Sequence, residues 1–359
     1  MKKLKILYVV GQLEIGGVEL QLLELVKHIN KSKFEIIICC LSEKTSLLKE
    51  FEKYCKVIIL KKILPIDITR ISRIIRITKE NNIDIVHNDV FPANFYGAIA
   101  GKFAKKPTII SYKQTQKNYL LKARIIDFFL SKLADKILVI SESIKQMLVK
   151  KAFFSKNKLI IIKEGINFND YRIKKIKKIK VIGTAGRLVI QKNHFLFLDA
   201  AKLVLEKYPK IRFIVAGNGS LKEQLIKHSK NLKIEKNVFF LGEIRNMKRF
   251  YSKIDLFLLT SSYEGTPIVI LEAIASNVPV IATNIPGTNE IIQNNKTGFL
   301  TEENAEKIAE KLIYLIENPE IAKKTAKQAR NKLKKKYSIK RKVKEMQELY
   351  QTLMKQDKK

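Results

Sequence analysis

Two glutamates eight residues apart, Glu264 and Glu272, are the strongest candidates for chemistry in the stretch TSSYEGTPIVILEAIASNVPVIATNIPGTNE, residues 260–290. Glu272 lies among apolar residues, where a carboxylate without partners is costly, so it must meet hydrogen-bond donors from the protein or from the hydroxyls of a ligand. Glu264 lies just upstream, beside the N–H groups of Ile268 and Val269, which would point out of the positive end of a helix. Such a helix end is a ready anion site.

A helix is predicted to follow Glu264 directly. Thr266 can serve as its N-cap and Pro267 suits the first helical position, so we expect the helix to begin here and to end near Asn277. Its apolar residues surround the axis, which predicts burial on all sides. The alternative to a ligand site is a structurally satisfied pair of glutamates at a turn.

The same stretch resembles the signature of a known enzyme family. The pair Glu264-x7-Glu272 lies within S-x-Y-E-G-T-P-I-V-I-L-E-A and precedes N-V-P-V-I-A-T and T-G-F-L. This pattern is similar to that of the retaining group 1 (family 4) glycosyltransferases of the GT-B fold. The resemblance implies that Glu272 accepts the ribose hydroxyls of a nucleotide-sugar and that Glu264 holds hydroxyls of the transferred sugar. Gly265, Thr266 and Pro267 would belong to the donor-binding segment.

Two cations, Arg187 and Lys192, lie between a predicted strand and helix in G-R-L-V-I-Q-K-N. Two fixed cations at the mouth of a sheet can neutralise a diphosphate and stabilise it as a leaving group. The motif resembles the diphosphate-binding pair of the family, and ordinary surface charge is the alternative. His194, which follows, is interpreted as a helix-start residue.

Two further loops in the second half are interpreted differently from each other. Leu241–Arg245, which contains Ile244, resembles the loop whose backbone contacts the nucleotide base in the family. Gly217–Ser220 is interpreted as a turn, because Ser220 and Glu223 can form a capping box.

In the first half, Gly16 and Gly17 lie at a strand-to-helix turn, where a backbone without Cβ can approach a phosphate or sugar closely. The G-G-V-E motif resembles the glycine loop of the family, which faces the diphosphate and the acceptor; a tight turn alone is the alternative.

His87 ends a predicted strand, where ligands of parallel sheets bind, and a packed structural histidine is the alternative. Where the family often has a histidine after the next strand, this chain has Ser111-Tyr112-Lys113, so a role for that histidine cannot be carried over.

Strand and helix patterns alternate along the chain, which predicts parallel, doubly wound sheets. The resemblance implies that these sheets belong to two Rossmann-like α/β domains that face each other across a cleft. Strands are expected at 5–10, 34–40, 57–60, 83–86, 108–110, 136–140, 158–162, 180–184, 211–216, 237–241 and 255–259, and helices after Gly17 and at 67–80, 92–104, 119–134, 142–152, 194–206, 221–229, 302–317, 319–336 and 339–354.

The domain boundary is placed at a basic segment. Residues 1–170 form the predicted N-terminal, acceptor-side domain, and residues 171–180, YRIKKIKKIK, a solvated linker. Residues 181–336 form the predicted nucleotide-sugar-binding domain. By analogy with the family, a C-terminal helix within 337–359 crosses back onto the N-terminal domain.

The net charge of +36 is spread rather than focused, with +15 over residues 1–170, +6 over 171–180 and +15 over 181–359. This spread, and the absence of a motif rich in aromatic residues and arginine, argues against a nucleic-acid partner. Apolar runs are too short for a membrane span or for a signal peptide, which predicts a cytoplasmic protein. An anionic membrane surface remains a candidate partner, through the basic amphipathic stretches Ile68–Lys79 and Phe128-Phe129 with Lys132.

The predicted function is sugar transfer with retention from a UDP- or GDP-linked donor to a saccharide or lipid-linked saccharide, in cell-envelope polysaccharide or glycan synthesis. Glu264, Arg187, Lys192 and His87 are the predicted catalytic residues. No cofactor and no metal are expected, since the chain has no D-x-D motif. The alternatives are a nucleotide-sugar epimerase of the same fold, a phosphorylase and, from another class, a basic nucleic-acid-binding protein.

Overall fold

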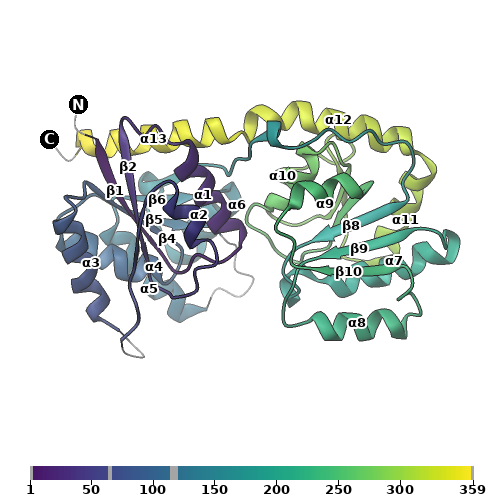
Figure 1. Ribbon diagram of the computed structural model, residues 1–359, viewed down its shortest axis with the longest axis horizontal. Helices are drawn as coiled ribbons and strands as arrows, with labels where there is room; N and C mark the ends of the chain where they lie inside the picture. The colour runs from purple at the N-terminus through teal and green to yellow at the C-terminus, as the bar shows by residue number, and fades with distance from the viewer. Residues whose placement is uncertain (1–2, 64–66, 114–119, 357–359) are drawn as a thin grey trace. The chain divides into compact units, whose positions relative to one another are not determined.

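Strands and helices alternate through the computed structural model, which describes residues 3–63, 67–113 and 120–356. The chain divides into two units, one formed by residues 1–165 with 339–359 and the other by residues 166–338. Figure 1 shows helices on both faces of the sheet in each unit. The predicted pair of doubly wound parallel sheets is therefore confirmed.

The elements of the first unit are β1 Leu4–Val10, α1 Gly17–His28, β2 Phe34–Cys40, α2 Leu48–Glu52, β3 Lys56–Ile59, α3 Thr69–Glu80, β4 Ile85–Asp89, α4 Ala93–Phe103, β5 Thr108–Tyr112, α5 Leu121–Leu133, β6 Lys136–Val139, α6 Glu142–Ala152, β7 Leu159–Ile161 and α13 Ile339–Gln356. Those of the second unit are β8 Val181–Ala185, α7 His194–Lys207, β9 Arg212–Ala216, α8 Lys222–Asn231, β10 Val238–Gly242, α9 Met247–Lys253, β11 Leu256–Leu259, α10 Ile268–Ala275, β12 Val280–Thr283, β13 Phe299–Thr301, α11 Ala305–Glu317 and α12 Pro319–Lys336.

The sheet of the first unit is buried on both faces. In the described residues it has the parallel order β3-β2-β1-β4-β5-β6-β7. Ile6 and Tyr8 of β1 face a cluster that includes residues of α1, α6 and α13, whereas Leu7 and Val9 face a cluster with residues of α3 and α4. Alternate side chains point to opposite faces of a strand, so a sheet covered on both sides requires apolar residues at every position.

The second unit repeats this arrangement with the order β10-β9-β8-β11-β12-β13 in its described residues. Ile182 of β8 and Leu256 of β11 pack with residues of α7 and α11. Val181, the residue before Ile182, and Phe257, the residue after Leu256, pack instead with residues of α9, α10 and α12. The two sets of helices therefore cover opposite faces of the sheet.

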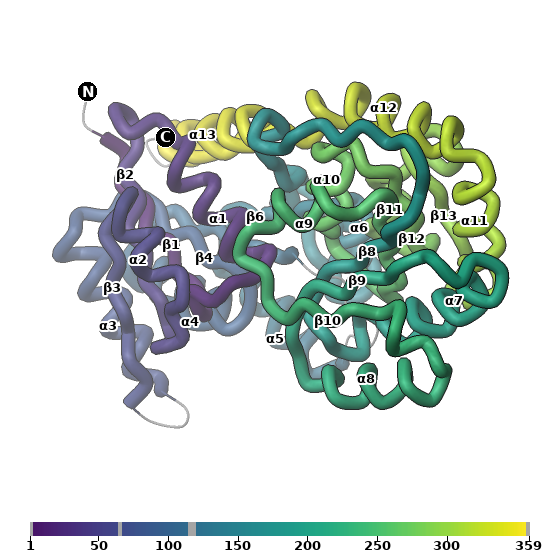
Figure 2. The backbone as a smooth tube through the Cα atoms, turned by 45° about the vertical axis from the view of Figure 1, so that its right-hand side comes forward, coloured from purple at the N-terminus to yellow at the C-terminus, as the bar shows by residue number. Residues whose placement is uncertain are grey.

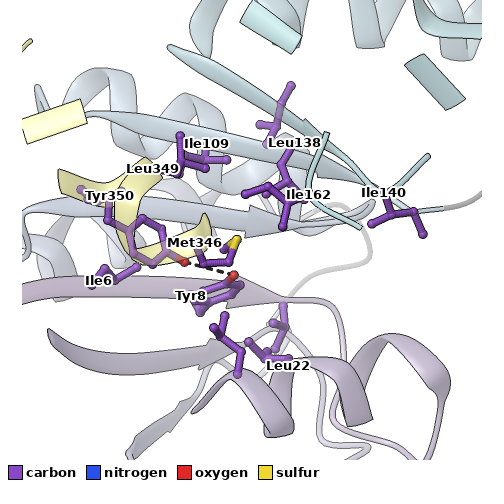
Figure 3. Close-up of a cluster of buried hydrophobic side chains, with 14 of the residues drawn as sticks. Ile6, Tyr8, Leu22, Ile109, Leu138, Ile140, Ile162, Met346, Leu349 and Tyr350 are labelled. Carbon is purple, nitrogen blue, oxygen red and sulfur yellow. Dashed lines mark hydrogen bonds between the residues drawn. The ribbon is translucent and has the colours of Figure 1, made fainter. Parts of the chain in front are cut away.

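The last helix, α13, packs in the first unit, where Figures 1 and 2 draw it in yellow close to α1. Met346, Leu349 and Tyr350 project from α13 into the core next to Ile6 (Figure 3). The Tyr350 hydroxyl donates a hydrogen bond of 3.2 Å to the hydroxyl of Tyr8. Residues 357–359 of the predicted C-terminal segment, and Tyr119 at the start of the predicted helix 119–134, lie outside the described residues.

The segment 171–180 differs from the predicted solvated linker. Ile176 and Ile179 are buried, and the backbone N–H of Lys174 donates to the carbonyl of Ser276 at 2.9 Å. The contacts divide the chain between residues 165 and 166, so this segment belongs to the second unit. Isoleucines recur between the lysines of this segment. They give it an apolar side, which the count of charged residues does not show.

Candidate active site

The second sheet reverses its strand order between β8 and β11, which are hydrogen-bonded neighbours. The chain continues from β8 to β9 on one side and from β11 to β12 on the other, so the loops after β8 and β11 diverge at their carboxyl ends. Ligands of open α/β sheets bind at such a switch point. The loop 186–193 follows β8 and carries Arg187 and Lys192, and the loop 260–267 follows β11 and carries Glu264.

Hydrogen bonds tie these two loops together. The Ser262 N–H donates to the carbonyl of Gln191, and the Gln191 side-chain amide donates to the carbonyl of Tyr263, each at 2.9 Å. The Thr260 hydroxyl donates to the carbonyl of Asn193, also at 2.9 Å. Backbone and side-chain bonds in both directions fix the loops relative to each other, so the residues they carry are held in place before any ligand arrives.

Glu264 and Lys192, both predicted site residues, form an ion pair across these loops. The Lys192 Nζ donates to the Glu264 Oε1 at 2.5 Å, and the Ser261 hydroxyl donates to the same oxygen at 2.7 Å. The side chains of Lys192 and Glu264 are only 15% and 7% exposed. The Thr283 hydroxyl donates to the carbonyl of Ser261, which fixes that residue in turn. The pair therefore presents an oriented carboxylate together with a cation.

Arg187 lies in the same loop, but its side chain is exposed. The structure therefore brings Lys192 to Glu264 and leaves Arg187 in solvent a few residues earlier in the chain. An arginine on a fixed loop can meet phosphate oxygens through two parallel N–H donors, whereas a lysine acts as a single charge. This arrangement suits a diphosphate that meets the exposed side chain of Arg187.

Two glycines allow the close packing of these loops. Gly287 has φ +94°, and a Cβ there would lie 2.6 Å from the carbonyl oxygen of Gly265 and 2.7 Å from that of Glu264. Gly217 has φ +140°, and a Cβ there would lie 1.9 Å from the carbonyl oxygen of Gly186. Both glycines therefore support the site loops by close backbone contact, a role that the sequence did not reveal.

The predicted capping box of Ser220 and Glu223 is wrong. Helix α8 begins at Lys222, and its N-cap, Leu221, makes no side-chain cap hydrogen bond. The turn is held instead by the neighbouring loop, because the Leu221 N–H donates to the carbonyl of Leu188 at 3.0 Å.

The predicted cap of α10 is also wrong. The N-cap is Pro267, with an extended ψ of 101° and no side-chain cap bond, and the helix runs only from Ile268 to Ala275. Thr266 is half-buried in the loop and Gly265 is buried. The N–H groups of Ile268 and Val269 still open the helix, where no carbonyl lies one turn back to accept them. The anion position at this helix end stays a prediction.

Glu272 meets the predicted donors within the protein. The Tyr171 hydroxyl donates to its Oε1 at 2.9 Å and the Tyr251 hydroxyl to its Oε2 at 3.0 Å. Burial raises the pKa of Glu272, while the two tyrosine hydroxyls and the charge of Lys248 act to lower it. A face formed by Ile268, Val269 and Glu272 is half-exposed, so the prediction of a helix buried on all sides is wrong.

Ile244 lies in the loop between β10 and α9 and is half-buried. It packs against the same apolar cluster as Ile268 and Val269. This places the predicted base-contacting loop and the start of α10 against one cluster of the second unit.

The candidates of the first unit lie in two places. Gly16 is the N-cap of α1, with extended backbone that any residue adopts, and Gly17 is the first helical residue. His87 is 1% exposed, and both ring nitrogens are engaged, Nδ1 with the Tyr350 hydroxyl at 3.0 Å and Nε2 with the Ser111 hydroxyl at 2.8 Å. Burial, then the positive charges nearby, hold the pKa of His87 well below its ordinary value. We therefore assign His87 to the alternative, a packed structural histidine, and give it no catalytic role.

Three residues of the second-unit site were missed by the sequence analysis. Tyr171, in the segment interpreted as a linker, and Tyr251, on the unpredicted helix α9, both bind Glu272. Ser261 precedes Glu264 by three residues and binds its carboxylate. The sequence offered one signal, and only for the helix that carries Tyr251. Asn246 is a residue type that often caps helices, and its side chain caps α9 by accepting from the Arg249 N–H at 3.1 Å.

His194 begins α7, as predicted for a helix-start residue. Within residues 3–63, 67–113 and 120–356, no group of three or more His, Cys, Asp or Glu side chains is placed to hold a metal ion. None of the helices in the described part of the chain is long and apolar enough to cross a bilayer.

Comparisons with known proteins cover both units. The family described as "Glycosyl transferases group 1" matches residues 167–332, and "Glycosyltransferase Family 4" matches residues 15–170. The Escherichia coli UDP-Gal:alpha-D-GlcNAc-diphosphoundecaprenol alpha-1,3-galactosyltransferase is 24% identical over 306 residues, which are 79% of this chain and 79% of that protein. The capsular polysaccharide biosynthesis glycosyltransferase CapH of Staphylococcus aureus is 25% identical over 314 residues, 81% of this chain and 84% of that protein.

Among solved structures, Anabaena HepE in complex with UDP-glucose superposes with a TM-score of 0.85 over 97% of this chain and 99% of that chain, at 19% sequence identity. At that identity the likeness is one of fold. The group 1 match contains both site loops and α10, and the family 4 match contains the glycine loop of the first unit. With two Rossmann-like parallel sheets and a family match to each half, the chain belongs to the group 1 glycosyltransferases and has the GT-B fold.

Proposed function

We propose that this protein transfers a sugar, with retention, from a UDP- or GDP-linked donor to a saccharide or lipid-linked saccharide in the synthesis of a cell-envelope polysaccharide or glycan. The observation that carries the proposal is the Lys192–Glu264 ion pair at the switch point of the second sheet. It combines a cation for a diphosphate with a carboxylate for sugar hydroxyls. Glu272, on the helix that follows the same loop, supplies a second carboxylate for the ribose.

The proposed chemistry uses residues of the second unit. The bond between the sugar C1 and the diphosphate oxygen breaks, and Arg187, Lys192 and the first N–H groups of α10 stabilise the charge that develops on the diphosphate. The acceptor oxygen forms the new bond to C1 on the same face, and its proton passes to the departing phosphate oxygen. Glu264 holds the sugar hydroxyls while this happens.

The relatives support the choice of donor and acceptor. The E. coli relative is named for a UDP-linked sugar and a saccharide on a lipid diphosphate, and the S. aureus relative for capsular polysaccharide biosynthesis. Anabaena HepE was crystallised with UDP-glucose. We therefore place UDP-sugars and a lipid-diphosphate saccharide first among the compounds to test.

The test is incubation with a panel of UDP- and GDP-sugars, with and without an undecaprenyl-diphosphate-linked N-acetylglucosamine acceptor. We expect a new disaccharide only when the acceptor is present, with an anomeric coupling constant by NMR that matches the configuration of the donor. Isomerised nucleotide-sugar without acceptor would identify an epimerase. An inverted anomeric centre would overturn retention but not transfer.

Metal independence is part of the proposal, because Arg187, Lys192 and the helix end supply the positive charge that a divalent ion would otherwise bring. Activity should persist in excess EDTA. Activity that returns only with Mg²⁺ or Mn²⁺ would contradict this part.

A cytoplasmic protein attached to an anionic membrane surface is also proposed, and α5 supports it. Leu121, Ile125 and Phe129 occupy successive turns of α5 and are 69%, 50% and 63% exposed, with the exposed Lys122 and Lys132 on the same helix. Exposed apolar side chains flanked by lysine suit the interface of an anionic bilayer.

The other predicted basic stretch, Ile68–Lys79, does not offer a free basic face. Arg70 is buried and donates to the carbonyl of Leu41 at 2.6 Å, Arg73 donates to the carbonyl of Lys61 at 3.0 Å, and Arg76 is ion-paired with Glu80.

Sedimentation with phosphatidylglycerol vesicles at low salt tests the proposed membrane attachment. Ile125→Ser with Phe129→Ser should lose sedimentation, whereas Phe239→Ser, an exposed aromatic of the second unit, should keep it. If the wild-type chain does not sediment, membrane attachment is wrong.

A further inference from the structure

Glu272 is held by two tyrosines that no sequence motif indicated, and the two are not equivalent. Tyr251 is fully buried, and its hydroxyl lies 3.0 Å from both the Glu272 Oε2 and the Val269 carbonyl oxygen. It has one proton for two acceptors. Tyr171 is half-buried, and its hydroxyl donates to the Glu272 Oε1 at 2.9 Å. The orientation of the carboxylate therefore depends strongly on Tyr171.

Tyr171 is itself fixed from a third element. Lys248 of α9 lies 5.8 Å from the centre of the Tyr171 ring and forms an ion pair of 3.0 Å with Asp170, the residue before it. The ring of Tyr171 also meets that of Tyr251 edge to face, with centroids 6.5 Å apart. Cation–π and edge-to-face contacts restrict the ring and so the position of its hydroxyl.

An ionised carboxylate has about four lone-pair positions, and two tyrosine hydroxyls occupy two of them. We propose that Tyr171 is a positioning residue, whose hydroxyl, with that of Tyr251, fixes the Glu272 carboxylate so that its two remaining lone-pair positions accept the ribose hydroxyls of the nucleotide. This inference rests on the proposed function. It adds a residue, outside the motif that contains Glu272, on which nucleotide affinity depends.

Protonation of Glu272 depends on the same contacts. The groups that face Glu272 are Tyr171, Tyr251 and Lys248, and each lowers its pKa against the larger effect of burial, which leaves the pKa above the ordinary value of 4.5. A carboxyl with a raised pKa contributes stability that is present below the ordinary value and is lost as the pH rises through the folded value. Removal of the Tyr171 hydroxyl raises the pKa of Glu272 in the folded protein further. The loss of stability at neutral pH therefore becomes larger.

The first measurement is calorimetry of UDP and of 2′,3′-dideoxy-UDP with wild type and Tyr171→Phe, repeated with the guanosine pair if the wild type prefers GDP. We expect the dissociation constant of UDP to rise about tenfold, as for a lost hydrogen bond to a charged group, while that of the dideoxy analogue stays the same. A merely structural role for Tyr171 would weaken both compounds equally, and that result would overturn the proposal.

The matched control is Tyr208→Phe. Tyr208 is also half-buried in the second unit, and its hydroxyl donates to the carboxylate of Glu317 at 2.6 Å, between α7 and α11 and not at α10. It should leave both dissociation constants unchanged. A loss of UDP affinity in Tyr208→Phe as large as that in Tyr171→Phe would also overturn the proposal.

The second measurement needs no nucleotide. The melting temperature of Tyr171→Phe should fall below that of wild type by an amount that grows from about pH 5 to about pH 7.5, and in the Glu272→Gln background the difference should not change with pH. If the wild type binds no nucleoside diphosphate, the proposed function fails and this measurement alone decides whether Tyr171 controls Glu272. A difference that is independent of pH in both backgrounds overturns the inference.

Discussion

The two sheets reverse their strand order in the same way, between β1 and β4 in the first unit and between β8 and β11 in the second, but the charged side chains beyond the strand ends differ in exposure. In the first unit, Lys113 donates to Asp89 at 2.6 Å and lies 4.0 Å from Glu164. Lys342 of α13 completes the cluster by donating to the other carboxylate oxygen of Glu164. All four side chains are at most 8% exposed.

In the second unit, the corresponding charges are partly open. Arg187 is exposed, Glu272 is half-buried, and the Lys192–Glu264 pair retains some contact with solvent through the lysine. Ser261, which binds Glu264, and Tyr171 and Tyr251, which bind Glu272, belong to the same unit. In the first unit, Lys342 comes from the far end of the chain.

The difference is one of solvent access: the first unit encloses its charged side chains, and the second leaves them partly open. Burial lowers the pKa of Lys113, but Asp89 and Glu164 outweigh that effect and raise it, while burial raises the pKa of Asp89. Isolated buried charges are costly, so each of these groups depends on the others. The cluster of the first unit therefore fixes α13 in place, whereas under the proposed function the partly open charges of the second unit meet a diphosphate and sugar hydroxyls.

The largest expected effect is on stability. Lys342→Met removes the cation with the largest effect on Glu164 and leaves this buried carboxylate with the weaker influence of Lys113 and Arg341, so the free energy of unfolding should fall by about 3–5 kcal/mol. Urea denaturation measures it, and Lys344→Met is the control, because Lys344 is 76% exposed on the same helix and should change little. If Lys342→Met is as stable as Lys344→Met, the cluster does not hold α13.

Glu264→Ala should act on catalysis. The carboxylate is expected to contact the transferred sugar most strongly as the glycosidic bond breaks, so kcat should fall by the equivalent of about 3–4 kcal/mol while the affinity for the bare nucleoside diphosphate stays nearly the same. Steady-state kinetics and calorimetry with the diphosphate separate the two effects. A loss of diphosphate affinity as large as that of Arg187→Ala would show that Glu264 does not have a separate role.

Local patterns predicted much of the fold. The helix expected at residues 319–336 coincides with α12, Pro319–Lys336, because proline at its start and a lysine-rich end are both local signals. Helix α9 was missed, since seven residues are too few to show a period. The extended ψ of Pro267, which overturns the predicted cap at Thr266, depends on the packing of its loop and has no local signal.

The candidate site was predictable where a motif carried it. Glu264 and Lys192 were expected in one site, and the structure joins them. Tyr171, one of the two partners of Glu272, was not predictable, because it lies 101 residues earlier in the chain. His87 shows the opposite error: it lies in the middle of β4 and not at a strand end, and the tyrosine that occupies its Nδ1 lies 263 residues later. Contacts over such separations are set by tertiary packing.

Arg187→Ala should have a smaller effect, and only on the affinity for the nucleoside diphosphate. The side chain is exposed, so the free energy of unfolding should stay within about 0.5 kcal/mol of wild type. The affinity for the nucleoside diphosphate should fall by about 1.5–3 kcal/mol, the value of hydrogen bonds to a charged group. Calorimetry at two salt concentrations measures this loss, and it should shrink at high salt, where the phosphate charge is screened. Unchanged affinity would remove Arg187 from the site.

The smallest expected effect concerns a buried histidine in each unit. Burial holds the pKa of His87 well below its ordinary value and that of His194 at about 4. A histidine with a lowered folded pKa contributes stability that is present above the ordinary value near 6.5 and is lost as the pH falls below it. The contribution of each histidine should therefore fall between about pH 7.5 and pH 5.5, and His87→Gln should lose about 1.4 kcal/mol less stability than wild type over this range.

The glutamine in His87→Gln can still hydrogen-bond to Tyr350 and Ser111, the partners of both ring nitrogens, but it does not titrate. His194→Gln should give a change of similar size from the second unit. Urea denaturation at both pH values measures both variants. The kcat profile of His87→Gln between the same pH values should match that of wild type, since the ring is enclosed by its own unit. A shifted profile would mean that the buried cluster of the first unit reaches the substrate, and the contrast between the two switch points would then be wrong.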